Sequence, residues 1–157
     1  MMNKELTTAS IAAALEDLAI LDSYGNTLKT VKCVSRRFKD VAGIGARMPM
    51  VVVVSGRQGS IKEMGGDSAR PYDTTFYVDI YGVIESSDSG DTMTNYFLQA
   101  IDDVVSPMIY DAEALPKVWS GRAISFGNGD DVLSKFGLST IPGRLCKITY
   151  ELQTMVA

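Results

Sequence analysis

The residues that could do chemistry in this sequence are carboxylates, hydroxyls and two thiols, because the 157 residues include no histidine. Histidine is the side chain that most often transfers protons near neutral pH. Asp102 and Asp103 form an acidic pair, but they fall on the polar side of an expected helix, where a solvated face explains them better than a general acid–base pair does. Asp130 and Asp131 follow a Gly-Asn-Gly turn and lack the alternating ligands and closing glutamate of a calcium loop. These carboxylates therefore predict no catalytic or metal site.

The two thiols, Cys33 and Cys146, are expected to be small buried hydrophobes, because each lies within strand-like alternation. Neither has a histidine to act as its base, and without a CxxC pair a zinc site lacks its usual ligands. No serine lies in a G-x-S-x-G turn, and the GIG of residues 40–46 (DVAGIGA) lacks the third glycine and the Lys-Ser/Thr pair of phosphate loops. The sequence therefore indicates no cofactor and predicts a protein that is not an enzyme.

A long polar connection separates two expected strands. It runs from Arg57 to Asp73, about 17 residues with glycines at 59, 65 and 66, and a connection of this length is usually functional or disordered. We interpret it as an arm that contacts a neighbouring subunit. An active-site lid is the alternative, ranked lower because no group elsewhere in the sequence completes a site. The candidate interface residues in the arm are Arg57, Gln58, Lys62, Glu63, Met64, Asp67 and Arg70.

The strand after the arm, Asp73–Glu85, alternates with a period of two, which predicts one buried face. Tyr77 and Tyr81 fall on its polar face, and we include them among the candidate interface residues because aromatic side chains are enriched at protein contacts. Packing of these tyrosines beneath a loop is an alternative that the sequence leaves open. The apolar face holds Phe76, Val78, Ile80 and Ile84, and the polar face also holds Thr75 and Asp79.

Two stripes of apolar residues at helical spacing predict the helices. The first covers Thr7–Tyr24, with Gly25 closing the helix. The second covers Thr92 to about Ser106, where Pro107 ends or kinks the helix.

The predicted strands complete one sheet. Met50–Ser55 is rich in β-branched residues, which predicts a central strand, buried on both faces, in an antiparallel hairpin with Asp73–Glu85. One sheet with both helices on a single face gives each apolar stripe a partner. We therefore predict an α+β fold in a single domain over residues 1–157: a mixed, mostly antiparallel sheet of about five strands, two helices packed on one face, and a long hairpin arm. Further strands are predicted over Thr27 to about Phe38, Val118–Phe126 and Arg144–Thr154.

Composition and charge narrow the function classes. A hydrophobic fraction of 46% and a charged fraction of 22% are ordinary for soluble domains, and the longest apolar run, Met48–Val54, is far below the roughly 20 residues of a membrane helix. The N-terminus lacks a secretory pattern, so a cytoplasm is expected. A net charge of −4 argues against binding nucleic acid by phosphate neutralisation. A solvated edge or a subunit contact is expected for the basic cluster Lys29, Lys32, Arg36, Arg37 and Lys39.

The chain resembles, over nearly its whole length, the tail terminator (tail completion) proteins of tailed bacteriophages. The resemblance lies in the order and hydrophobic rhythm of its segments, and in the polar arm between two strands. These segments are ASIAAALEDLAILD, TTFYVDIYGVIE, TNYFLQAIDDVVSPMI and RLCKITYELQTM.

The resemblance implies a homo-oligomer, a ring of six copies, that caps the tail tube, stops its polymerisation and forms the joint to the head. The implied partners are the tail tube protein, the head–tail connector protein and, in a contractile tail, the sheath protein, with DNA only passing through the lumen and no membrane involved. The implied location is the neck region of the virion, after assembly in the host cytoplasm. Another neck or tail-tube component is the alternative, followed by a small carboxylate-dependent enzyme.

Overall fold

The computed structural model describes residues 4–36, 48–63, 72–85, 90–111, 113–116, 118–128 and 143–156. Two helices and seven strands lie within these ranges. In chain order they are α1 (Lys4–Ala14), β1 (Ala19–Leu21), β2 (Thr27–Thr30), β3 (Cys33–Ser35), β4 (Met50–Glu63), β5 (Tyr72–Glu85), α2 (Gly90–Ile109), β6 (Val118–Asn128) and β7 (Gly143–Val156).

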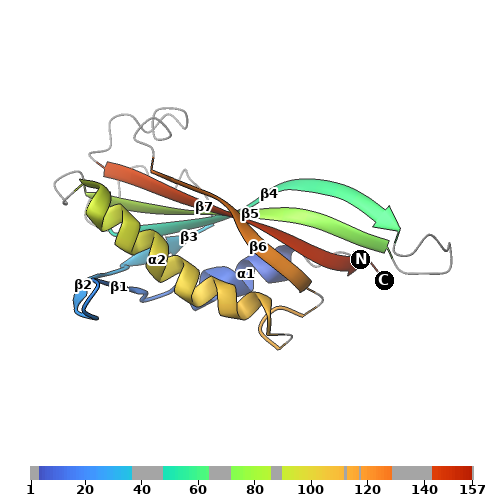
Figure 1. Ribbon diagram of the computed structural model, residues 1–157, viewed down its shortest axis with the longest axis horizontal. Helices are drawn as coiled ribbons and strands as arrows, with labels where there is room; N and C mark the ends of the chain where they lie inside the picture. The colour runs from blue at the N-terminus through green and yellow to red at the C-terminus, as the bar shows by residue number, and fades with distance from the viewer. Residues whose placement is uncertain are drawn as a thin grey trace.

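A five-stranded sheet organises the described part of the chain, in the order β3-β4-β5-β7-β6. β3 runs parallel to β4, and the other neighbours pair antiparallel. Both helices lie against the same face of this sheet (Figure 1). The predicted α+β class, with a mixed and mostly antiparallel sheet of five strands and two helices on one face, is therefore confirmed.

The pairing of β5 with β7 forms the interior of the sheet. The two strands stay in register without an irregularity from Tyr72↔Val156 to Glu85↔Gly143. Because side chains alternate between the two faces of a strand, one face of this pair carries an unbroken apolar set. Complete burial of each such side chain stabilises the fold by roughly 1.5–3 kcal/mol. The buried members of the set are Phe76, Val78, Ile80, Ile84, Cys146, Ile148, Tyr150 and Leu152.

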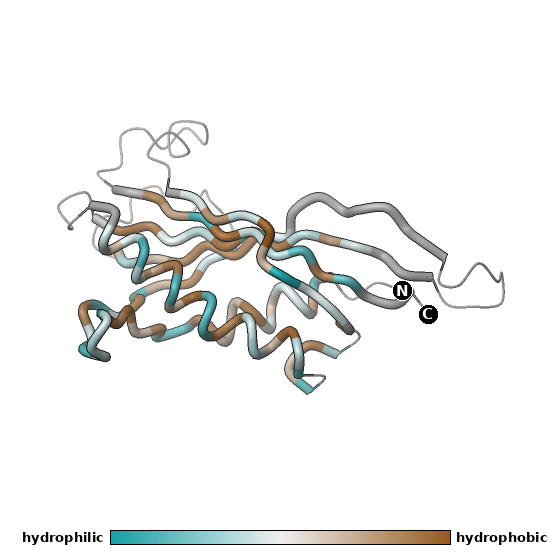
Figure 2. The backbone as a smooth tube through the Cα atoms, viewed as in Figure 1, coloured by the Kyte–Doolittle hydropathy of each residue, from teal (hydrophilic) through white to brown (hydrophobic). Residues whose placement is uncertain are grey.

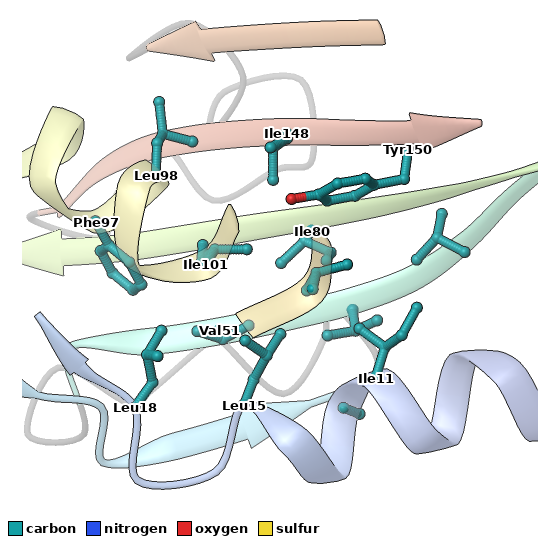
Figure 3. Close-up of a cluster of buried hydrophobic side chains, with 14 of the residues drawn as sticks. Ile11, Leu15, Leu18, Val51, Ile80, Phe97, Leu98, Ile101, Ile148 and Tyr150 are labelled. Carbon is teal, nitrogen blue, oxygen red and sulfur yellow. The ribbon is translucent and has the colours of Figure 1, made fainter. Parts of the chain in front are cut away.

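The α1 and α2 regions cover this apolar face with side chains at helical spacing. Ile11 and Leu15 come from α1 and the turn after it, and Phe97, Ile101 and Val105 recur every four residues along α2. All five are fully buried. Figure 2 shows hydrophobic and hydrophilic residues alternating along α2, and Figure 3 shows side chains from both regions pointing into one cluster with the sheet. This packing is the reason that both predicted stripes have a partner.

The N-terminal helix is shorter than the sequence predicts. α1 ends at Ala14, and in the turn that follows Asp17 has a left-handed backbone conformation with φ of 57°. The chain then forms β1, which pairs antiparallel with β2 in a small separate sheet. Gly25, predicted to close the helix, instead lies in the β1–β2 turn, where its φ of 82° is a left-handed conformation that glycine adopts readily. The prediction that the helix continues past Ala14 is therefore wrong. Leu18 misled it, because this residue has helical spacing but reaches the core from the connection after the helix.

The single strand predicted over Thr27 to Phe38 is also wrong, because it is divided between two sheets. β2 pairs with β1, whereas β3 pairs with β4. Between them the amide of Val31 donates a hydrogen bond to the Leu18 carbonyl, and the amide of Lys32 donates one to the Pro49 carbonyl. These two hydrogen bonds fix the segment that connects the β1–β2 hairpin to the main sheet.

β4 is longer than predicted. It continues to Glu63, and its pairing with β5 reaches Glu63↔Tyr72. The prediction that a connection between the strands begins at Arg57 is therefore wrong for residues 57–63 and 72, which belong to β4 and β5, while residues 64–71 lie outside the described ranges. Pairing with β5 outweighs the weak strand propensity of the polar, glycine-containing segment. β7 pairs with β5 as far as Tyr72, at the end of the β4–β5 hairpin. That this hairpin projects from the domain as an arm stays a prediction.

The strands on either side of the β5–β7 pair are irregular. β4 has two extra residues relative to β5, and β6 has two relative to β7, which are the register shifts expected of β-bulges. β6 is an edge strand, and among the described strands β4 has a neighbour other than β5 only over Met50–Val52. The shifts lie between Ser55 and Gln58, Gln58 and Ile61, Val118 and Ser120, and Ala123 and Ser125.

α2 continues past the residue at which the sequence predicts its end. It runs to Ile109 and contains Pro107 in its last turn. Proline removes the one hydrogen bond that its own nitrogen would donate, and Ile109, only 3% exposed, anchors the final turn in the core. The sequence predicts that Pro107 either ends or kinks the helix, and the first of these two predictions is therefore wrong.

Gly82 lies in β5 opposite Cys146, under α2. A Cβ atom at Gly82 would lie 2.8 Å from Cys146 Sγ and 2.9 Å from Phe97 Cε2, well inside the optimal separation of packed atoms. We expect Gly82→Ala to lower the free energy of unfolding by about 1–3 kcal/mol, because the added methyl group overpacks the core. Urea unfolding followed by circular dichroism measures this change.

Gly127→Ala is the matched control, because a Cβ atom at Gly127, in β6, meets nothing within 4 Å. Its free energy of unfolding should stay within about 0.5 kcal/mol of the wild-type value. Equal losses in the two variants would contradict the close-packing explanation.

Candidate subunit interface

Four of the residues predicted in the arm lie in the second half of β4, and their side chains lie outside the described part of the structure. The register sets Gln58 opposite Phe76 and Glu63 opposite Tyr72. A contact of these residues with another subunit stays a prediction. The four residues are Arg57, Gln58, Lys62 and Glu63. The other three, Met64, Asp67 and Arg70, lie outside the described residues.

The sheet face opposite the helices carries a polar group between β5 and β7. Thr149 Oγ1 donates a hydrogen bond of 2.7 Å to Asp79 Oδ1, and Lys147 Nζ lies 3.9 Å from the same oxygen. Next to the Asp79–Thr149 pair on this face, Tyr77 of β5 pairs with Glu151 of β7, and Glu151 in turn pairs with Arg122 of β6. Cross-strand rows of opposite charge and aromatic side chains stabilise a sheet modestly. This surface is polar, aromatic and close to neutral, which suits a protein contact better than a catalytic centre.

The two tyrosines predicted on this face differ in burial. Tyr77 is half-buried, whereas Tyr81 is only 4% exposed. Lys147 Nζ lies 5.3 Å from the centre of the Tyr81 ring, a cation–π distance. Burial raises the pKa of Tyr81 above its usual value near 10, and the positive charge of Lys147 opposes this rise. Tyr81 packs within a second buried cluster with Met48, Met50, Val52, Val83 and Leu145.

The expectation that Tyr81 is exposed is therefore wrong, whereas its contact with another subunit stays a prediction. Of the two interpretations that the sequence left open, packing describes Tyr81. The alternation places Tyr81 on the correct face of β5, but it carries no information on what covers that face. Tyr77 keeps its place as a candidate interface residue.

Asp102 is also predicted to lie on a solvated helix face, but the structure shows it in contact with the buried Tyr150 instead. Its Oδ1 accepts hydrogen bonds of 2.8 Å from the Tyr150 hydroxyl and 2.7 Å from Ser106 Oγ, and its residue is half-buried. Asp103 is exposed as predicted and accepts a 2.8 Å hydrogen bond from Gln99. The two carboxylates therefore point in different directions and do not form an acid–base pair.

The hydrogen bond from Tyr150 joins β7 to α2. Burial first, and then the hydrogen bond to Asp102 and the negative charge of Asp102, raise the pKa of the Tyr150 phenol above its usual value near 10. The phenol therefore keeps its proton and acts as a hydrogen-bond donor that fixes the helix on the sheet. A sequence signal for this contact exists: a tyrosine at an inward position of a strand needs a partner for its hydroxyl.

A groove of about 690 Å³ lies between the β1–β2 hairpin and α2. Sequence reasoning missed it, because β1 was expected to be helical. The available signal was a second stripe on α2, Tyr96, Ala100 and Val104, four residues apart, which lines the groove together with Leu18 and Leu21. The Tyr96 hydroxyl lies 2.9 Å from Ser23 Oγ, so a hydrogen bond ties the hairpin to the helix. The remaining lining residues are Ala19, Asp22, Ser23, Asn95, Gln99 and Asp103.

Both cysteines are free thiols. Cys146 is fully buried, as predicted, and its Sγ lies 3.6 Å from the carbonyl oxygen of Gly82. Burial raises the pKa of the Cys146 thiol from its usual value near 9 to about 12. Cys33, in contrast, is partly exposed. A thiol that stays protonated is a poor nucleophile, so Cys146 packs as a hydrophobe.

Comparison with known proteins adds no family assignment. No protein-family model matches the chain, and no curated protein matches it either. Within the described residues, no three potential metal ligands come together, and neither helix combines the length and apolarity that crossing a membrane requires.

The raised pKa values predict how stability depends on pH. Below about pH 9 the folded and unfolded chains both hold the Tyr150 and Cys146 protons, so this contribution is complete. As the pH rises above the usual values of these groups, near 10 for the phenol and 9 for the thiol, the unfolded chain releases its protons while the folded chain retains them. We expect the free energy of unfolding to fall over this range, measured by urea unfolding at a series of pH values.

Tyr150→Phe tests the assignment to the phenol. Its unfolding free energy should depend less steeply on pH than that of the wild type near pH 10, because one group that titrates differently in the two states is gone. An unchanged pH dependence would show that Tyr150 does not contribute.

Proposed function

We propose that this chain is a structural protein of a bacteriophage virion, a tail terminator that forms a closed ring of six copies. The ring caps the tail tube, ends tube polymerisation and joins the tail to the head connector, with the sheath as a further partner in a contractile tail and DNA passing only through the lumen. The proposal is supported by the order and hydrophobic rhythm of the segments that resemble this family.

The observation that carries the proposal is the polar part of the sheet face opposite the helices. Two helices cover one face. The other face is buried around Tyr81, Val83 and Leu145, and beyond this cluster it presents a row of polar and aromatic side chains, Tyr77, Glu151 and Arg122, across three strands. A closed ring requires a fixed rotation between neighbouring subunits. Long strands in continuous register, such as β5 and β7, make a stiff body that can hold such a rotation.

The charge of the chain supports a role around passing DNA. Six copies with a net charge of −4 give a ring of −24. A strongly negative ring repels the phosphate backbone and so disfavours DNA adhesion. This effect requires no specific site in the lumen.

We expect the purified protein to form a closed oligomer of about six subunits, because heterologous contacts with a fixed rotation close into a ring. Native mass spectrometry and multi-angle light scattering give the copy number, and negative-stain electron microscopy gives the shape. Open-ended tubes would favour a tail-tube protein instead. A chain that stays monomeric at every concentration, alone and with tail tubes, would refute the proposal.

The two tyrosines of β5 provide a second test. Tyr77→Ala should reduce ring formation with little loss of stability, because this side chain is only half-buried. Tyr81→Ala should lower the free energy of unfolding by about 3 kcal/mol or more, because it leaves a cavity in a buried cluster. Light scattering measures the first effect and urea unfolding the second. Assembly that is unaffected by Tyr77→Ala would remove this residue from the interface.

A further inference from the structure

The charge of the chain is strongly divided along its sequence. Residues 71–116 include nine Asp or Glu and no Lys or Arg, whereas residues 29–47 include six Lys or Arg and one Asp. The acidic segment contains all of α2, and the basic segment begins within β2. Opposite charges on separate segments of one chain favour contacts between copies of that chain.

The groove between α2 and the β1–β2 hairpin belongs to the acidic part of the surface. Among the described residues, its lining includes Asp22 and Asp103 and contains no lysine or arginine. Hydrogen bonds from the backbone amides of Asn26 and Tyr24 orient Asp22 and hold the pKa of its carboxyl below the usual range. Within the part of the chain that the structure describes, neither Asp22 nor Asp103 has an ion-pair partner. The groove thus combines an apolar floor with an anionic rim.

The basic residues Lys29 and Lys32 lie elsewhere, Lys29 in β2 and Lys32 in the connection from β2 to β3. They line a separate hollow with Asp17, Met48 and Pro49, and no described residue lines both this hollow and the groove. Lys32 is exposed, and Glu16 and Asp17 lie near it. Leu28, in β2 beside Lys29, is 41% exposed. β2 and the connection that follows it therefore carry an exposed apolar side chain, Leu28, and an exposed cation, Lys32.

We propose that the groove of one copy receives β2 and the connection after it from a second copy, with Leu28 on the apolar floor and Lys32 beside Asp103. This inference rests on the proposed ring and identifies the contact that closes it. Each copy contacts one neighbour through its groove and the other neighbour through its β2 segment. The contact is therefore heterologous and can continue around a ring.

A two-fold dimer across the groove is disfavoured by the same charges. It would place Asp22 and Asp103 of one copy against those of the other, and like charges brought together cost several kcal/mol. The head-to-tail arrangement instead brings each anionic rim to a lysine.

Charge reversal at the two positions tests the contact. Asp103→Lys and Lys32→Glu should each raise the concentration needed for half-assembly by about tenfold or more, because each places like charges together. The double variant Asp103→Lys with Lys32→Glu restores the opposite pair and should return assembly toward the wild-type value. Light scattering over a dilution series measures assembly, and circular dichroism confirms that every variant is folded.

Glu113→Lys is the matched control. It changes the net charge by the same amount as Asp103→Lys at an exposed residue that does not line the groove, so its ring should form at the wild-type concentration. A ring that persists in both single variants, or a double variant that assembles no better than the single ones, would overturn this contact while leaving the proposed function intact. A wild-type monomer would overturn both.

Discussion

The register between β5 and β7 is the constraint on which the other features depend. Because side chains alternate, a slip by one residue would turn every inward side chain of one strand to the opposite face. Tyr150 would lose Asp102, and with it the hydrogen bond that joins β7 to α2. Asp79 would lose Thr149 on the other face. The same pairing thus positions both the helical layer and the polar face.

The central part of the fold could be predicted from the sequence because local pattern and burial coincide there. The alternation around Phe76–Ile84 and Cys146–Leu152 has the period of a strand, and both inward sets are buried. The four-residue spacing of Phe97, Ile101 and Val105 likewise defines the buried side of α2. The prediction failed where two structures satisfy the same spacing. Leu18 reaches the core from a turn, so its helical spacing gave no information on the helix end.

The candidate site was harder to predict, because its residues are distinguished by partners far away in the sequence. Tyr77 and Tyr81 have equivalent places in the alternation, yet only Tyr81 is buried, in a cluster that includes Met48 and Leu145. Asp102 and Asp103 are neighbours on one helix, and Tyr150, 48 residues beyond Asp102, distinguishes them. The groove required knowledge that the chain after α1 folds back as a hairpin. The stripe of Tyr96, Ala100 and Val104 is periodic, but no periodic pattern in the sequence identifies the partner that a side chain contacts.

The irregular strands on either side of the regular β5–β7 pair carry a consequence for solubility. An even, straight border of unpaired amides and carbonyls can template the stacking of further strands, as in amyloid. The extra residues in β4 and β6 interrupt that template and increase the local twist. At high protein concentration these irregular strands therefore disfavour fibrous aggregation, because an even main-chain ladder cannot extend from them.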